Sequence, residues 1–389
     1  MCARYRIHFT DFILKATVSA ANFLGILPFR YNKIKRRVES SKFLINYTIG
    51  INVITVILLI LSWPTQDHLN VDILQRKPIV ALVNSVNLYS TMYTIVLIIW
   101  ANWRDHRRLL DFFNACWFME CECFRIFNEY QQECVQFDKY IIWKGVLTVL
   151  QNISFVNTVY DFENYSLFFR VLLIIFVYFL LNVMLITIQL FNICVLYQYR
   201  GFWVLNRRLE HISELELRQW NVVHIEEEIS RLSGIYLRLL RICRRSTIMY
   251  EQQTLLMIAV LSGANILGLF FAKIIWTGKV LEMSAWSIFF NLQMILINLI
   301  DFWLTITICE LTVNTSKRTS DLLRKFNDYR HLGKGLARNM EQFAFICCDN
   351  QLSFRVCGLF DLNHVTGCHV LFTMILYFIY FVQFDYNDL

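Results

Sequence analysis

Seven apolar stretches dominate the chain. Each has few or no charged residues and roughly the length that a helix needs to cross about 30 Å of hydrocarbon. The predicted spans are residues 43–62, 79–100, 145–160, 171–199, 252–272, 283–309 and 362–384. The third is short, since Lys144 precedes it, and it crosses only if that side chain snorkels to the surface. The pattern predicts an all-α membrane protein with seven transmembrane helices.

The last stretch, residues 362–384, differs from a helix that only lipid surrounds. It has no Asp, Glu, Lys or Arg, yet it keeps polar side chains that hydrocarbon penalises unless water or a partner satisfies them. These are Asn363, His364, Thr366, His369, Thr373 and Gln383. Asp301 likewise interrupts the sixth stretch and should face protein or water. We therefore expect water or a neighbouring chain along part of the last span.

The composition agrees with a membrane protein. Of the 389 residues, 57% are hydrophobic and 17% are charged, which is too apolar for an ordinary soluble domain. The net charge of +7 does not indicate a nucleic-acid partner, because the basic residues form no single stripe. The 12 cysteines show no regular spacing, so we expect reduced thiols rather than a disulfide framework.

The basic residues predict the orientation. Most of the 37 Lys and Arg residues lie before span one, or between spans two and three, four and five, and six and seven. By the positive-inside rule the N-terminus is cytosolic and the C-terminus extracellular. This is the reverse of a G-protein-coupled receptor. In addition, no span contains the Pro of that family's Asn-Pro-x-x-Tyr motif, and no Asp-Arg-Tyr follows span three.

Two segments predicted to be cytosolic have the pattern of amphipathic helices. Between spans four and five, apolar residues recur at three- and four-residue steps, at Ile225, Ile229, Leu232, Tyr236 and Leu239. Before span seven, a second apolar face contains Met340, Phe343, Ile346 and Phe354. We expect a cytosolic helical bundle whose faces meet a partner subunit. The alternative is that these helices pack only within one subunit.

The sequence offers no candidate for enzyme chemistry or for a cofactor. His364 and His369 are five residues apart, on different faces of a helix, and the Cys121/Cys123 and Cys347/Cys348 pairs lack the two-residue gap of a zinc knuckle. No glycine-rich phosphate loop, nucleophile elbow or pair of catalytic carboxylates is present. We therefore predict neither a metal site nor an enzyme.

A small-molecule pocket in the outer halves of the helices fits the sequence better. Aromatic walls with a few amides suit an uncharged organic ligand. The candidate ligand-binding residues are Asn87, Phe155, Asn157, Tyr160, Asn265, Trp286, Phe289 and Phe290. Ordinary packing and interfacial aromatic residues are the alternative for each of them.

A sequon, Asn164-Tyr165-Ser166, lies in the short second outer loop, where Asn164 is a candidate glycosylation site. A chance match is the alternative, since Asn314-Thr315-Ser316 occurs on the predicted cytosolic side.

Gln383, at the outer end of the last span, has two interpretations. Symmetric copies of this amide could form a ring of uncharged dipoles that cations pass, with Phe384 closing the path. A terminal Gln could equally snorkel to the membrane surface. The residues alone leave both open.

The end of the chain resembles the signature of the insect gustatory receptors. The matching residues are Gly358-Leu359-Phe360, then Tyr377, five mostly apolar residues and Gln383-Phe384. Leu376 departs from the family's Thr. Sugar-tuned members carry Glu directly after the signature Tyr; the residue here is Phe378, which favours a bitter or other aversive ligand.

The resemblance implies a ligand-gated, non-selective cation channel in the plasma membrane of chemosensory neurons, on dendrite, axon and soma. It implies a homotetramer, or a heteromer with related subunits, that contacts membrane lipid and binds a tastant. Tyr377, Tyr380, Gln383 and Phe384 would then line or gate the pore.

The expected division of the chain follows from the spans. Residues 1–42 form a cytosolic segment, 43–309 the ligand-binding part, 310–357 the cytosolic anchor helices, and 358–389 the pore helix and extracellular tail. The alternative function is a multispan solute transporter coupled through Asp301 and the histidines of span seven, although the chain lacks the internal repeat and broken helices typical of that class.

Overall fold

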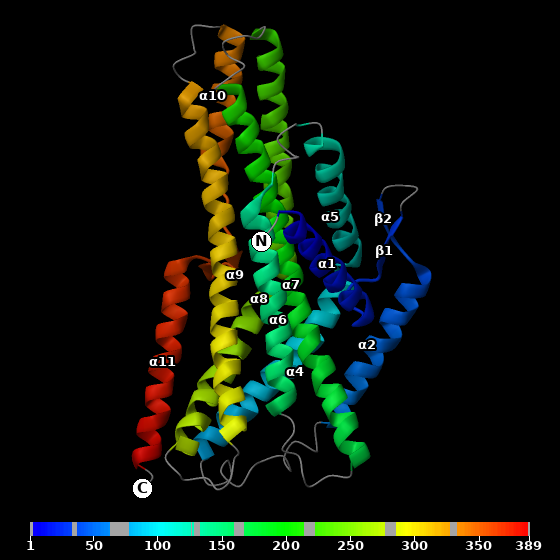
Figure 1. Cartoon of the computed structure of the whole chain (residues 1–389), viewed down its shortest axis with the longest axis vertical. Coiled ribbons are helices and arrows are strands. Elements are labelled where there is room, and N and C mark those ends of the chain that lie inside the picture. The colour runs from blue at the N-terminus through cyan, green and yellow to red at the C-terminus, as the bar shows by residue number, and fades with distance from the viewer. Residues whose placement is uncertain are drawn as a thin grey trace.

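The computed structural model describes residues 3–32, 37–62, 78–125, 127, 133–158, 167–213, 222–276, 285–326 and 333–387. Helices dominate these ranges (Figure 1). They are α1 (Ala3–Phe23), α2 (Lys42–Ser62), α4 (Pro78–Arg104), α5 (His106–Phe118), the π-helix η2 (Met119–Phe124), α6 (Val135–Thr158), α7 (Leu167–His211), α8 (Val222–Trp276), α9 (Ala285–Lys325), α10 (Lys334–Asp349) and α11 (His364–Asn387). Two short antiparallel strand pairs, which the sequence did not predict, are β1 (Phe29–Asn32) with β2 (Arg37–Ser40) and β3 (Arg355–Val356) with β4 (Phe360–Asp361).

Six of the described helices are long and apolar enough to cross a membrane: Lys42–Leu61, Ala81–Arg104, Ile174–His211, Val223–Ile274, Phe289–Lys325 and His364–Phe384. These correspond to six of the seven predicted spans. The remaining one, within α6, is helical but is not among the six, so the count of seven stays a prediction.

Lys144 of α6 does not snorkel, and that expectation was wrong. Its side chain is 3% exposed, and its Nζ atom lies 2.5 Å from Oδ1 of Asp301 on α9. Asp301 is equally buried, at 5% side-chain exposure, so it faces protein as predicted. Because α6 packs between α7 and α9, the ammonium finds its counter-charge inside the bundle and has no need to reach the surface (Figure 1).

Three helices extend well beyond one bilayer. α7, α8 and α9 have 45, 55 and 41 residues, whereas about 20 residues suffice to cross the hydrocarbon. Their far ends and α10 form a helical bundle at the end of the molecule opposite the C-terminus (Figure 1). The sequence predicted a bundle here from the amphipathic pattern.

The apolar core of this bundle is complete within one chain. The ring of Tyr236 on α8 packs edge-on against Phe202 of α7 at 5.6 Å and Phe343 of α10 at 5.5 Å between centroids, and its hydroxyl lies 3.2 Å from Ser316 Oγ. Ile225 and Ile229 are at most 2% exposed. α7, α9 and α10 of the same chain therefore cover these residues, as the alternative interpretation had it, and contact of the bundle with a partner subunit stays a prediction.

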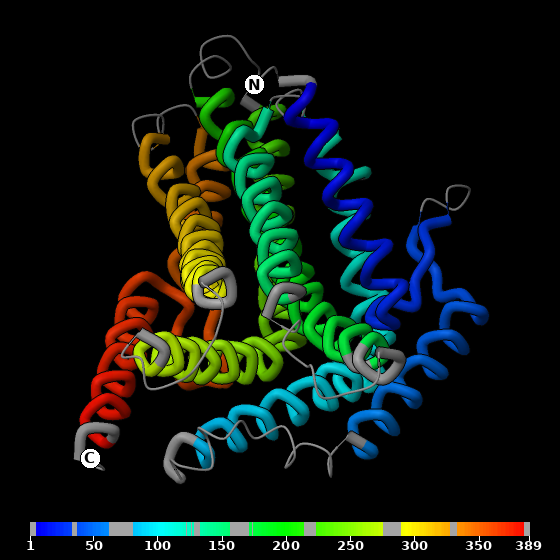
Figure 2. The backbone as a smooth tube through the Cα atoms, turned by 60° about the horizontal axis from the view of Figure 1, so that its bottom comes forward, coloured from blue at the N-terminus to red at the C-terminus, as the bar shows by residue number. Residues whose placement is uncertain are grey.

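The N-terminal part packs on the side of the bundle. α1 runs along α6 and α7 (Figure 2), where Arg6 Nε donates to Asp138 Oδ2 at 3.0 Å and Arg6 also pairs with Glu133. The β1–β2 hairpin is joined to α5 by Asn114, whose Oδ1 accepts from the Val38 N–H at 2.8 Å and whose Nδ2 donates to the Val38 carbonyl at 3.0 Å. An amide side chain thus takes the place of a third strand.

Two adjacent cysteines on α10 provide a test of both packing and sidedness. Cys348 is exposed, whereas burial raises the pKa of Cys347 to about 12 and leaves its thiol protonated at neutral pH. A membrane-impermeant maleimide should label this peptide only in permeabilised cells. The label should disappear in Cys348→Ser and persist in the matched variant Cys347→Ser, as read by mass spectrometry. Labelling of intact cells would contradict the predicted orientation.

Candidate functional site

α11 is the least covered of the candidate membrane helices. Of the apolar, membrane-length segment of α11, 11% is buried within the chain, against 22–50% for the corresponding segments of the other five helices. It packs mainly on α8 and α9 and stands at the edge of the molecule (Figure 1). The contact with α8 includes Phe381, whose ring lies 5.9 Å from that of Phe270. Among the described residues, the opposite face of α11 is largely uncovered, with Phe372 70% and Tyr377 53% exposed.

That open face carries a polar stripe. Thr366, His369, Thr373, Tyr377, Tyr380 and Gln383 follow one another at the three- and four-residue steps that place side chains on one side of a helix. Apart from the half-buried Thr366, all of them are exposed. The four predicted pore residues share this side. Tyr377, Tyr380 and Phe384 are 53%, 47% and 50% exposed, and Gln383 is exposed as well.

The start of α11 is fixed to α9. The Glu310 carboxylate accepts a hydrogen bond from the His364 backbone N–H at 2.8 Å, where an anion suits a helix N-terminus. The His364 ring stacks on Trp303 at 5.0 Å between centroids. Gly367 allows this close approach, since a Cβ there would lie 2.7 Å from Ile306 Cδ1. A displacement of α9 would therefore carry the beginning of α11 with it.

A tight turn between β3 and β4 leads into α11. The Leu359 N–H donates to the Val356 carbonyl at 2.9 Å, and the central residues Cys357 and Gly358 have φ angles of 48° and 69°. Two successive left-handed residues make this a type I′ turn. The geometry gives a physical reason for Gly358 in the Gly-Leu-Phe motif.

Substitution of Gly358 should reveal that backbone requirement. A Cβ at this position has nothing within 4 Å, so the cost of a side chain is conformational and not steric. Gly358→Ala should destabilise the protein by about 1–2 kcal/mol, whereas Gly358→Asn, which tolerates the left-handed region, should cost less. Thermal unfolding of the purified protein checks the order. Equal melting temperatures for the Ala and Asn variants would contradict it.

The structure places some of the predicted pocket residues in the packed interior. Asn265 of α8 accepts a hydrogen bond from Asn298 Nδ2 at 3.3 Å, and Asn298 Oδ1 in turn accepts from Gln151 Nε2 at 3.1 Å. All three are buried. Asn87 of α4 packs against Gly263, where a Cβ would lie 2.5 Å from Asn87 Oδ1. These amides therefore join α4, α6, α8 and α9 at the same level of the bundle.

The predicted aromatic members are more dispersed. Phe289 and Phe290 lie in contact on α9, with 5.5 Å between ring centroids, but Phe289 is 56% exposed and so lies on the surface of that helix. Phe155 is half-buried on α6. The side chains of Asn157, Tyr160 and Trp286, like Asn164, lie outside the described residues. The ligand pocket therefore stays a prediction.

The pair of Lys144 and Asp301 is the feature that sequence reasoning missed. Lys144 also donates to Thr305 Oγ1 at 3.2 Å, and Asn192 Nδ2 donates to the same hydroxyl at 3.2 Å, which links α6, α7 and α9. The signal in the sequence was two opposite charges, each isolated in or beside an apolar stretch of span length.

Comparison with known proteins identifies the family. A family model described as 7tm Chemosensory receptor matches residues 14–388. The chain belongs to this chemosensory receptor family. The family consists of membrane receptors and is not a class of enzymes.

Relatives of this chemosensory receptor include two proteins of Drosophila melanogaster. The gustatory receptor for bitter taste 22e is 29% identical over 99% of this chain and 98% of the relative, and the putative gustatory receptor 22b is 30% identical over 97% and 96%. The insect olfactory receptor OR5 from Machilis hrabei has the same fold. The TM-score is 0.70, and 0.73 for its complex with eugenol, with 97% of this chain and 99% of that chain covered at 12% identity.

Proposed function

We propose that this receptor is a gustatory receptor that acts as a ligand-gated, non-selective cation channel. The observation that carries the proposal is the polar stripe on the open face of α11. Hydrocarbon would penalise exposed groups such as His369, Thr373 and Gln383 along a membrane span. A water-filled path between several copies of α11 satisfies them and gives the helix the cover that the described part of its own chain does not supply.

The pore would form between four subunits, either identical or related. Tyr377, Tyr380, Gln383 and Phe384 face away from their own chain and would line or gate the path. Gln383 would present a ring of uncharged dipoles, which suits passage of cations without strong selectivity. The Phe384 rings would exclude water in the closed state.

Ligand binding would act on this pore through α8 and α9. Both helices contribute residues to the predicted outer pocket, and both pack on α11. A ligand opens the channel if it binds the open arrangement more tightly than the closed one. The contact of Glu310 with His364 offers the mechanical link between α9 and the pore helix.

The proposed ligand class is bitter or otherwise aversive compounds. A relative covering nearly the whole chain is named as a receptor for bitter taste. Phe378 replaces the Glu that sugar-tuned members carry after the signature Tyr. The olfactory receptor with the same fold has been solved with eugenol, an uncharged aromatic molecule. We place the receptor in the plasma membrane of chemosensory neurons, with a glycan on Asn164 as a further proposal.

Whole-cell recording tests this function. Cells expressing the chain, alone and with related subunits, should give cation currents with bitter compounds or eugenol and none with sugars. Saturable uptake of a solute without any evoked current would instead favour the transporter. The pairing of Asp301 with Lys144 speaks against that alternative, since the carboxylate is neutralised within the bundle.

A further inference from the structure

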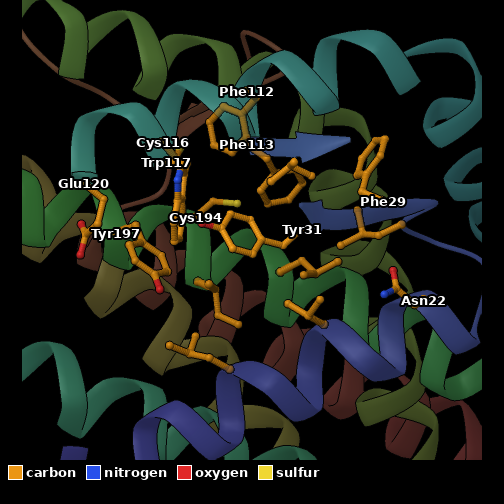
Figure 3. A pocket seen from close by; sticks show the side chains of 16 residues that line it. Asn22, Phe29, Tyr31, Phe112, Phe113, Cys116, Trp117, Glu120, Cys194 and Tyr197 are labelled. Carbon is orange, nitrogen blue, oxygen red and sulfur yellow. The ribbon is translucent and has the colours of Figure 1, made fainter. Parts of the chain in front are cut away.

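A cavity of about 300 Å³ lies away from the predicted ligand pocket. It is partly open and is lined by α1, the β1–β2 hairpin, α5 and the middle of α7 (Figure 3). The sequence predicted no site here. The proposed channel function does not use this cavity.

The walls of the cavity are apolar and firmly held. Phe113 of α5 contacts the rings of Phe112, at 5.6 Å between centroids, and of Phe29 on β1, at 6.2 Å. Tyr31 packs on Trp117 at 4.6 Å. The hairpin that carries Phe29 and Tyr31 is fixed to α5 by the two hydrogen bonds of Asn114. The cavity is thus a built feature of the fold and not a gap between loosely packed elements.

Two polar atoms in the lining are buried without a hydrogen-bond partner among the described residues. One is the acceptor Asn22 Oδ1 on α1, and the other is the donor Trp117 Nε1 on α5. Their side chains lie on opposite sides of the cavity (Figure 3). A buried donor or acceptor that is left unpaired is unfavourable, so both favour an occupant that can complete a hydrogen bond.

The lining offers no unpaired charge, so it favours an uncharged occupant. Glu120 lies at one side of the cavity, where its carboxylate is already 3.4 Å from the guanidinium of Arg200. The other lining residues carry no formal charge. A hydroxyl group satisfies the remaining requirement, since it donates to an amide oxygen and accepts from an indole N–H.

The position of the cavity points to the membrane as the source. The uncharged stretch of α7 begins at Val171, and a helix needs about 20 residues to cross the hydrocarbon, so Leu190 and Cys194 lie near the far boundary. Arg104, which ends α4, lies at the end of span two that is predicted to be cytosolic, on the same side of the membrane. An amphiphile in that leaflet has its polar end at this depth.

We propose that this cavity binds a membrane-derived, uncharged amphiphile with an apolar chain and a hydroxyl head. The chain occupies the space between Phe112, Leu190 and Cys194, and the hydroxyl pairs with Asn22 or Trp117. The bound lipid joins α1 and the hairpin to α5 and α7. This site is independent of the tastant pocket and of channel activity.

Photolabelling of the full-length protein in lipid nanodiscs tests the site. The probe is hexadecanol with a diazirine in the chain and a terminal alkyne. Its adducts should map to peptides of α1, α5 or α7, and excess hexadecanol should suppress them. One of the two variants Trp117→Phe and Asn22→Leu, the one that removes the hydroxyl's partner, should weaken binding about five- to tenfold, the effect of one lost hydrogen bond, and no effect of either would contradict the proposed pairing. Cys194→Phe should fill the cavity and abolish the adducts.

The matched control is Trp143→Phe, which changes an exposed Trp on α6 and should leave labelling unchanged. Thermal unfolding shows which variants are folded. If Cys194→Phe does not fold, the conservative variant Trp117→Phe, together with Asn22→Leu, still tests the proposal. Labelling spread evenly over the lipid-facing helices would overturn the proposal. So would adducts that persist in a folded Cys194→Phe protein, or adducts that eugenol displaces and hexadecanol does not.

Discussion

Asp301→Asn should destabilise the receptor by roughly 3–5 kcal/mol, the cost of leaving one charge of a buried pair without its partner. Lys144 and Asp301 are 2.5 Å apart, with side chains only 3% and 5% exposed. The substitution keeps the shape of the side chain but removes its charge, so the ammonium stays buried without a counter-charge, beside a neutral amide and the Thr305 hydroxyl. The melting temperature of the protein in nanodiscs and the amount of receptor at the cell surface should both decrease.

A double variant distinguishes the effect of losing the whole ion pair from the effect of leaving one charge unpaired. Lys144→Met with Asp301→Leu removes both charges and should recover most of the lost stability, since apolar replacement of a buried ion pair is often neutral. The matched control is Asp321→Asn on the same helix, where the carboxylate is 71% exposed and 3.9 Å from Arg324; it should change stability by less than about 0.5 kcal/mol.

The double variant also tests the transporter alternative more cleanly than Asp301→Asn alone, which confounds function with folding. A channel should keep its agonist-evoked current without the pair. Loss of all function in a double variant that melts like the natural protein would mean that the carboxylate has a role in coupling. A melting temperature of Asp301→Asn equal to that of the unchanged protein would contradict the structural role.

Features that depend on residues close together in the sequence were predictable. Uncharged runs located six membrane helices, although α7, α8 and α9 continue beyond them, and the three- and four-residue repeat through Ile225, Ile229 and Tyr236 predicted the helix at the start of α8. The polar side chains within residues 362–384 predicted a helix that lipid alone does not surround, and its surroundings stay a prediction. These predictions depend on the period of a helix and on the thickness of a bilayer, and neither requires knowledge of a partner.

What the sequence did not predict depends on distant partners. Lys144 meets Asp301 across 157 positions, and Val38 meets Asn114 across 76, so no local pattern could indicate either contact. For the same reason the sequence could not show which candidate pocket residues have hydrogen-bond partners inside the chain, and the pocket stays a prediction. Asn265 has the residue type of a ligand-binding amide, but a neighbour on α9 already uses its oxygen. A single charged residue in an apolar stretch predicts that a partner exists but does not show which residue it is.

The final expectation concerns the pore. Gln383→Lys should abolish most of the cation current, because symmetric copies would place several ammonium groups around one narrow path. At a separation of about 8 Å and an effective dielectric of about 20, each ammonium repels a passing cation by on the order of 2 kcal/mol. A single such barrier reduces the rate more than about tenfold, and a ring of them reduces it further.

Two controls make the result specific to this position. Gln383→Glu reverses the sign of the ring and should preserve or increase cation permeability, which the reversal potential under asymmetric salt reports. Gln351→Lys makes the same substitution at an exposed glutamine outside α11 and should leave the current unchanged. If Gln383→Lys reaches the cell surface and conducts like the unchanged receptor, the open face of α11 contacts lipid instead of a pore. The polar stripe would then need a different partner.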